Sequence, residues 1–366
     1  MTESSAAAVR VGGVRSGGAR RDGSGADLDR LGAAAWAVDG DAERAIAFAV
    51  DVAVDLPRPG AGRTSDLFDA LATIAAADLT AARVLEAHID ALSILAQADA
   101  DADAVETAGA ADRSWGVFAA EAPRQRVSAT RESDGWHLDG GKPWCSLAGS
   151  LDRALVTAHT TAEGVTPAHR RLFAVDLSAP GVTVQNGAWV ATGLTQVPSG
   201  PVDFVAVAAE PVGADDWYLT RPGFSWGGIQ VAACWWGGAV GVARRLAAAA
   251  AEREPDQIMR AHLGAVDLAL LGAGAALADA AAMIDAGEAV GEAGTLLAAR
   301  VRGLVARTVD EVLGRVGHAL GPAPLALDAR HARRTADLTL YVRQHHAERD
   351  DAALGARLLT GGDAAW

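Results

Sequence analysis

The sequence predicts an α+β chain in three parts: N-terminal helices, a middle antiparallel β domain and a C-terminal four-helix bundle. Three observations support this order. Apolar residues recur at helical spacings of three and four up to about Ala100, short β-rich runs follow, and helical spacing returns after Phe224. The expected parts are a tail at 1–27, a helical domain at 28–110, a β domain at 111–215 and a helical bundle at 216–366.

The first 110 residues divide into a tail and a helical domain. Residues 1–27 are rich in Gly, Ser, Ala and Arg and contain little apolar surface to bury, so we expect disorder there. From Leu28 to about Ala100 the chain is alanine-rich and has the apolar spacing of amphipathic helices. The acidic stretch after Ala100 breaks this pattern and marks a boundary.

Short runs such as "GWHLDGG", "RALVTAHT", "RRLFAVDL" and "VDFVAVAA" alternate with Gly, Pro, Asp and Ser between Trp115 and Val212. This alternation of β-rich runs with turn-forming residues is typical of antiparallel strands joined by turns. After "RPGF" the chain predicts four long helices joined by short Gly/Pro breaks. They are expected at about 227–254, 256–285, 293–320 and 328–359.

Composition argues against several classes of protein. The 366 residues are 50% hydrophobic and 21% charged, which is enough for a large core shared by more than one domain. A net charge of −14 argues against a nucleic-acid partner, because phosphate neutralisation requires a basic face. Cys145 and Cys234 are the only cysteines, so neither a disulfide scaffold nor a metal site is supported, and we expect a cytoplasmic protein. No uninterrupted apolar run reaches the ~20 residues of a membrane helix, so no membrane association is expected.

The stretch "GGKPWCSLAG" at 140–149 holds Lys142, the only lysine, followed by Trp144 and Ser146. A Gly-Gly-Lys-Pro turn positions the backbone after it, since glycine tolerates positive φ and proline fixes φ near −65°. An indole and a hydroxyl two residues apart then lie on one side of a strand. This pair suits a flat heteroaromatic ligand.

Several segments in this order resemble the acyl-CoA dehydrogenase family of flavoproteins. They are "WGVFAAEAP", "GWHLDGGKPWCSLAG", "LFAVDLSAPGV", "YLTRPGF" and "VGHALGPAPLALDARHARRTADL". The resemblance implies an FAD-dependent oxidoreductase that acts on an acyl thioester such as an acyl-CoA, or on a related small substrate, as a homodimer or homotetramer. In that family a Trp-x-Thr/Ser segment packs on the flavin, which is Trp144 and Ser146 here, and the turn before it places Ala120 beside the flavin.

The resemblance implies further cofactor residues in the bundle. Arg253 stands where the family reaches the flavin pyrophosphate of a neighbouring subunit. His318 and Gly321 stand where a Gln and a Gly-rich turn meet the FAD of the partner chain, although Pro322 and Pro324 stiffen that turn here.

At the position of the catalytic base, this sequence differs from the acyl-CoA dehydrogenase family that it resembles. The position that usually holds a glutamate falls at Arg343, which is not a base, and the alternative position near 224–230 holds no carboxylate. Glu348 is the nearest carboxylate, and His345 or His346 suits oxygenating relatives of the same fold. A dehydrogenase, a flavin-dependent monooxygenase and a non-catalytic subunit with a decayed site therefore all stay open.

Overall fold

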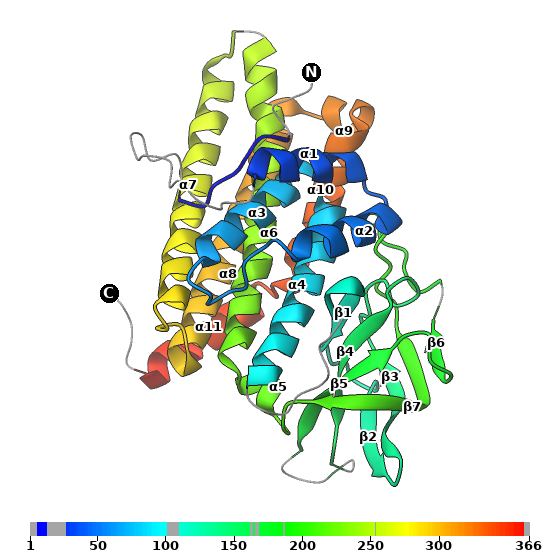
Figure 1. Cartoon of the computed structure of the whole chain (residues 1–366). Coiled ribbons are helices and arrows are strands. Elements are labelled where there is room, and N and C mark those ends of the chain that lie inside the picture. The colour runs from blue at the N-terminus through cyan, green and yellow to red at the C-terminus, as the bar shows by residue number, and fades with distance from the viewer. Residues whose placement is uncertain are drawn as a thin grey trace.

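The protein is described from a computed structural model that defines residues 6–12, 27–100, 110–161, 164, 168–185, 187–252 and 254–361. It has the predicted α+β architecture, with the strands gathered beside α4 and the long helices packed together (Figure 1). The N-terminal helices are α1 (Leu28–Val38), α2 (Ala42–Ala53), α3 (Thr64–Ala77) and α4 (Leu79–Ala100). Asp27 and Asp41 cap α1 and α2 by accepting backbone N–H bonds from Arg30 and Arg44.

Part of the segment that was expected to be disordered packs on the helical domain. Val9 and Val11 are 5% and 1% exposed, and their backbone N–H groups donate to Thr73 Oγ1 and Asp69 Oδ1 of α3. The prediction of disorder is therefore wrong for residues 6–12. Composition missed it because two valines bury enough surface only when α3 offers polar side chains to their backbone.

The middle domain is a seven-stranded sheet in which five strands close into a ring, β4–β2–β3–β7–β5 and back to β4. Its strands are β1 (Trp115–Phe118), β2 (Val127–Glu132), β3 (Gly135–Lys142), β4 (Arg153–His159), β5 (Arg170–Asp176), β6 (Val182–Val184) and β7 (Val202–Val212). Most pairs are antiparallel as predicted, but β1 and β2 both pair with β4 in parallel. Alternation in sequence does not specify strand direction, and the β2–β3 hairpin supplies the crossover that a parallel pair needs.

The C-terminal region is built around three long helices, α6 (Pro222–Glu252), α7 (Gln257–Asp285) and α8 (Gly291–Leu320). Most residues of α6 between Ile229 and Val242 are buried, as the apolar sequence predicts, whereas the last turns of the helix are not, and α6 crosses α3 closely. A Cβ on Gly237 would lie 2.3 Å from the Ala72 carbonyl oxygen, and one on Gly241 would lie 2.6 Å from that of Ala76. Glycine at these two positions permits the contact between the N-terminal helices and the bundle.

The fourth predicted helix is broken. The region comprises α9 (Ala323–Leu327), α10 (Ala329–Tyr341), a 3-10 turn η3 (Val342–Gln344) and α11 (Glu348–Gly361). The break at 345–347 includes Ala347 with φ of 48°, a left-handed conformation that no helix interior contains. Helical spacing continues across the break, so the sequence pattern alone predicted one helix.

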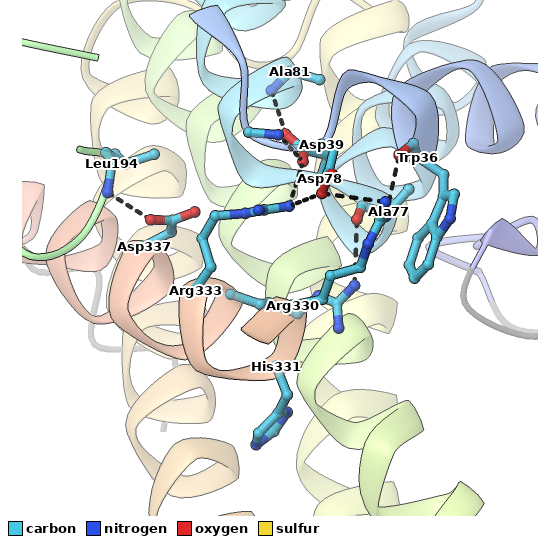
Figure 2. A network of polar contacts seen from close by, with 12 residues as sticks. Trp36, Asp39, Ala77, Asp78, Ala81, Leu194, Arg330, His331, Arg333 and Asp337 are labelled. Atoms are coloured by element: carbon cyan, nitrogen blue, oxygen red, sulfur yellow. Dashed lines mark hydrogen bonds and ion pairs between the residues drawn. The ribbon is translucent and has the colours of Figure 1, made fainter. Parts of the chain in front are cut away.

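A polar network joins α10 to the N-terminal helices (Figure 2). Arg333 pairs with Asp39 at 2.6 Å and with Asp78 at 3.6 Å. Asp78 lies between α3 and α4 and accepts backbone N–H bonds from Gly40 and Ala81. Two turns of the N-terminal domain are therefore held by one arginine of α10.

Helix α7 is the one described helix that is long and apolar enough to cross a membrane by length and composition. This is weak evidence, because core helices of soluble proteins meet the same criterion. The helix packs against α6 and α8 but leaves Leu268 and Leu271 exposed.

Candidate functional site

A cavity of about 1170 Å³ lies where the β domain meets α4, α6, α8 and α10. Its volume is slightly above the roughly 300–1,000 Å³ typical of small-molecule sites. Its lining combines residues of the N-terminal helices, the β domain and the C-terminal helices, among them Arg83, Glu86, Ala120, Glu121, Trp144, Ser146, Ser199, Arg302, Tyr341, Arg343 and His346. The cavity therefore exists only when the three parts are assembled.

Trp144 and Ser146 lie together on the cavity wall just after the end of β3. The segment is held by backbone bonds from Cys145 N to Gly200 O at 3.0 Å and from Leu147 N to Pro198 O at 2.8 Å. Trp144 has φ of 58° and its indole is 61% exposed. An aromatic residue in the left-handed region costs conformational energy, and such strain concentrates at functional sites. The wall thus presents an apolar ring that is largely open to the cavity.

Ser146 is placed by two hydrogen bonds from separate parts of the chain. Its Oγ lies 2.8 Å from Ser199 Oγ and accepts a 3.1 Å bond from Arg83 Nη2 of α4. Ser199 in turn donates to the Val197 carbonyl. The hydroxyl is therefore fixed relative to both the β domain and the helical domain.

Behind this wall, the only lysine is used as a buried support. Lys142 Nζ donates to Glu121 at 2.7 Å and to Thr157 at 2.8 Å. Burial lowers the pKa of Lys142, while the bonds to Glu121 oppose that shift. Burial also raises the pKa of Glu121, but Lys142 outweighs it and holds this pKa below its ordinary value. The pair anchors the turn that brings Ala120 to the cavity.

Beside Ser146 lies a buried polar group that residue spacing along the chain did not predict. Arg83 pairs with Glu86 at 3.1 Å, and Tyr341 of α10 donates a 3.1 Å hydrogen bond to the same carboxylate. Burial raises the pKa of Glu86, and the Arg83 guanidinium offsets this only in part. Arg83 and Glu86 are two of several charged residues in α4, which also holds Asp90 and Asp99, and their spacing does not reveal which of them face the cavity.

No protein-family model matches the chain, and no curated protein matches it by sequence. Its structure is similar to that of butyryl-CoA dehydrogenase from Megasphaera elsdenii, with a TM-score of 0.75 at 16% identity over 89% of this chain and 94% of that one. The chain has the acyl-CoA dehydrogenase fold.

Two further structures have the same acyl-CoA dehydrogenase fold. FMN-bound TdsC from Paenibacillus sp. A11-2, a dibenzothiophene monooxygenase, gives a TM-score of 0.74 at 20% identity, covering 91% of this chain and 96% of TdsC. KijD3 in complex with FMN and dTDP-3-amino-2,3,6-trideoxy-4-keto-3-methyl-D-glucose gives 0.75 at 20% identity, covering 91% of this chain and 92% of KijD3.

The cofactor residues implied for a partner chain do not meet this cavity. At about 1.5 Å per residue, His318 lies roughly 24 Å along α8 from Arg302, near Gly321 at the helix end. Its ring lies against His262 of α7, with the ring centroids 6.2 Å apart. Neither His318 nor Gly321 lines the cavity, and Arg253 lies outside the described residues.

Around the break after η3, Arg343 and His346 line the cavity, whereas His345 and Glu348 do not. Arg343, at the position of the usual base in the acyl-CoA dehydrogenase fold, pairs with Asp310. His345 is buried with its Nε2 3.7 Å from Asp350, and Glu348 is exposed at the start of α11. The cavity's own carboxylates are Glu86, Asp90 and Glu121.

Three tryptophans of α6, Trp226, Trp235 and Trp236, lie outside the cavity lining. Trp226 and Trp236 donate to the Ala289 and Leu270 carbonyls, and Trp235 is fully buried. The one described grouping with the spacing of a metal site is Glu132, Asp134 and His137 on the β2–β3 hairpin, and it lies away from the cavity.

Proposed function

We propose that the protein is a flavin-dependent oxidoreductase that acts on a small molecule in the cavity between the β domain and the helices. The observation that carries this proposal is the exposed Trp144, with its left-handed backbone, beside Ser146 on one wall of that cavity. The Ser146 hydroxyl is held by two hydrogen bonds. An exposed indole next to a fixed hydroxyl is suited to stack on a flat heteroaromatic ring and bond to its edge.

The residues present fit a flavin. Trp144 would cover one face of the ring system, Ser146 would bond to its edge, and the turn at Ala120 would supply backbone contacts. A bound flavin accepts a hydride from a substrate. We propose FAD, as the family resemblance implies, with FMN as the alternative because TdsC and KijD3 were solved with FMN.

For a dehydrogenation, the proposed proton acceptor is Glu86. It lines the cavity, burial raises its pKa, and its bonds to Arg83 and Tyr341 fix its orientation. A carboxylate with a raised pKa is better matched to proton transfer near neutral pH. Glu348 and His345 do not line the cavity, so Glu86 replaces them in this role.

A flavin-dependent monooxygenase is the second candidate. Arg343 occupies the usual position of the base, and His346 lies on the cavity wall with its side chain 64% exposed. A histidine on the cavity wall is a residue type that can transfer protons in catalysis. Oxygen consumption without an added electron acceptor would distinguish this reaction from dehydrogenation.

The proposal also includes a cytoplasmic homodimer or homotetramer with no nucleic-acid or membrane partner. Exposed Ile258, Leu268 and Leu271 of α7 give the apolar surface that association of copies would cover. His318 and Gly321 would then approach the flavin of a second copy.

An absorbance spectrum of the purified protein, taken after incubation with FAD or FMN and gel filtration, tests the proposal. We expect flavin bands that co-elute with protein and weaken in a Trp144→Ala, Ser146→Ala double variant. Thr183→Ala, an exposed hydroxyl of β6 outside the cavity lining, is the control and should retain flavin. Absence of retained flavin in the wild type would reject both reactions and leave a non-catalytic subunit.

A further inference from the structure

Five arginines line the cavity, and four of them are paired with carboxylates. The pairs are Arg83 with Glu86 at 3.1 Å, Arg221 with Asp90 at 3.5 Å, Arg357 with Glu292 at 2.7 Å, and Arg343 with Asp310. Among the residues that the structure describes, no carboxylate lies within 4.0 Å of the fifth, Arg302. Buried charges in proteins are normally paired, so this exception calls for a physical reason.

The contacts of Arg302 orient its guanidinium without neutralising it. Nη1 donates to the Gly228 carbonyl at 2.9 Å, Nη2 donates to the Gln344 carbonyl at 3.4 Å, and the group lies 4.7 Å from the centroid of the Trp235 ring. A guanidinium has five N–H donors, and the carbonyl oxygens carry no formal charge. Donors therefore remain for a ligand, and the plane of the fork is already fixed.

The carboxylates nearest to this group are otherwise engaged. Burial lowers the pKa of Arg302, and Asp350 and Glu86 oppose that shift from beyond ion-pair distance. Glu86 accepts bonds from Arg83 and Tyr341, and Asp350 accepts the backbone N–H of His346. The cavity is lined by five arginines but only three carboxylates in a chain whose net charge is −14. The other four arginines are neutralised by their carboxylate partners, so the uncompensated charge at the described cavity wall is that of Arg302.

We propose that Arg302 binds an anionic group, a carboxylate or a phosphate, of the small molecule that occupies the cavity. The planar fork matches either group in a two-point contact. Trp189, Tyr218 and Phe224 add aromatic surface to the same cavity, so the favoured ligand is an acid with a flat apolar body. The role of that acid as substrate rests on the proposed function, whereas the charge complementarity does not.

The test is calorimetric titration of benzoate and of benzamide, which has a similar shape but no charge, into the purified protein with its flavin content measured. We expect benzoate to bind about 10- to 100-fold more weakly to Arg302→Met than to wild type, the range for a hydrogen bond to a charged group. Benzamide affinity should not change, and Arg302→Lys should give an intermediate benzoate affinity. Arg307→Met on the same helix, which removes an exposed pair with Asp351, is the matched control and should bind benzoate normally.

A second arm identifies the source of the anion. If the bound group is the cofactor phosphate, Arg302→Met will weaken FMN binding while leaving riboflavin binding unchanged, and benzoate will show no preference over benzamide. Either pattern supports the anion site.

Equal affinities of the wild type for benzoate and benzamide, together with equal affinities for FMN and riboflavin, would overturn the proposal even if the methionine variant does not fold. Selective benzoate binding in a protein that retains no flavin would reject the oxidoreductase but leave the anion site standing.

Discussion

The carboxylate of Asp337 on α10 accepts a hydrogen bond from the backbone N–H of Leu194, a residue of the loop that lines the cavity (Figure 2). The loop approaches the helix so closely that a Cβ on Gly193 would lie 2.2 Å from the Ala336 carbonyl oxygen. The same loop continues to Ser199, which bonds to Ser146. Helix α10 therefore supports the cavity wall that carries the predicted flavin contacts.

Asp337→Asn is expected to stabilise the protein at neutral pH. Burial raises the pKa of Asp337 from 3.8 to about 6. The folded chain thus holds a proton that the unfolded chain releases, so stability falls as pH rises from about 4 to 6, and the full cost applies above pH 6. Asparagine keeps an acceptor for Leu194 without the charge. We expect a gain of about 1–3 kcal/mol at pH 7.5 and little change at pH 4, measured by urea unfolding.

Burial also raises the pKa of Asp69 to about 6. Because Asp69 is present in both the wild type and Asp337→Asn, its contribution to the pH dependence cancels when the two are compared. Asp337→Leu, which removes the acceptor, should destabilise at both pH values. A variant with the same pH dependence as wild type would contradict the assignment to Asp337.

Gly193→Ala is expected to displace the cavity loop. The added methyl group would meet backbone atoms of α10 that do not move easily, at a cost of about 1–3 kcal/mol. Flavin retention should fall as well, because Ser199 and Leu194 lie on the displaced loop. Gly149→Ala is the matched control, since no heavy atom lies within 4 Å of a Cβ placed there. Similar unfolding midpoints for the two variants would show that the close approach has no energetic consequence.

The pair of Lys142 and Glu121 should respond asymmetrically to substitution. The lysine side chain is 2% exposed and the glutamate 35%. Glu121→Leu leaves a buried ammonium with only Thr157 as partner, and we expect a loss of about 2–4 kcal/mol. Lys142→Met leaves a carboxylate that retains His159, Arg170 and solvent, and we expect about 1 kcal/mol. Chemical denaturation of both variants measures the difference, and a larger loss for Lys142→Met would reverse the explanation.

The N-terminal segment should contribute measurable stability. A Val9→Ala, Val11→Ala variant removes buried methyl groups and should lower the free energy of unfolding by about 1–3 kcal/mol. Val54→Ala, at a valine that is 60% exposed, is the control and should have a small effect. If both variants unfold at the same denaturant concentration, the segment does not contribute to the folded state in solution.

The sequence by itself determined the order of the three parts, because helical and strand spacing are local properties of the chain. It also placed Trp144 and Ser146 close together, because they are two residues apart, but the expected strand geometry is wrong, since both follow the end of β3 and Trp144 has a φ of 58°. The same local reasoning was wrong at 328–359, where apolar spacing continues through a break in the helix. It was wrong for residues 6–12, whose burial depends on α3.

Only the tertiary structure decided what surrounds the cavity wall that carries Trp144 and Ser146. Arg83, Glu86 and Tyr341 come from helices far apart in sequence, and their bonds depend on how α10 packs beside α4. Arg302 is one arginine among many in the sequence, and its lack of a carboxylate partner appears only once its neighbours are placed. Charge compensation is a property of three-dimensional distance, which residue spacing along the chain does not encode.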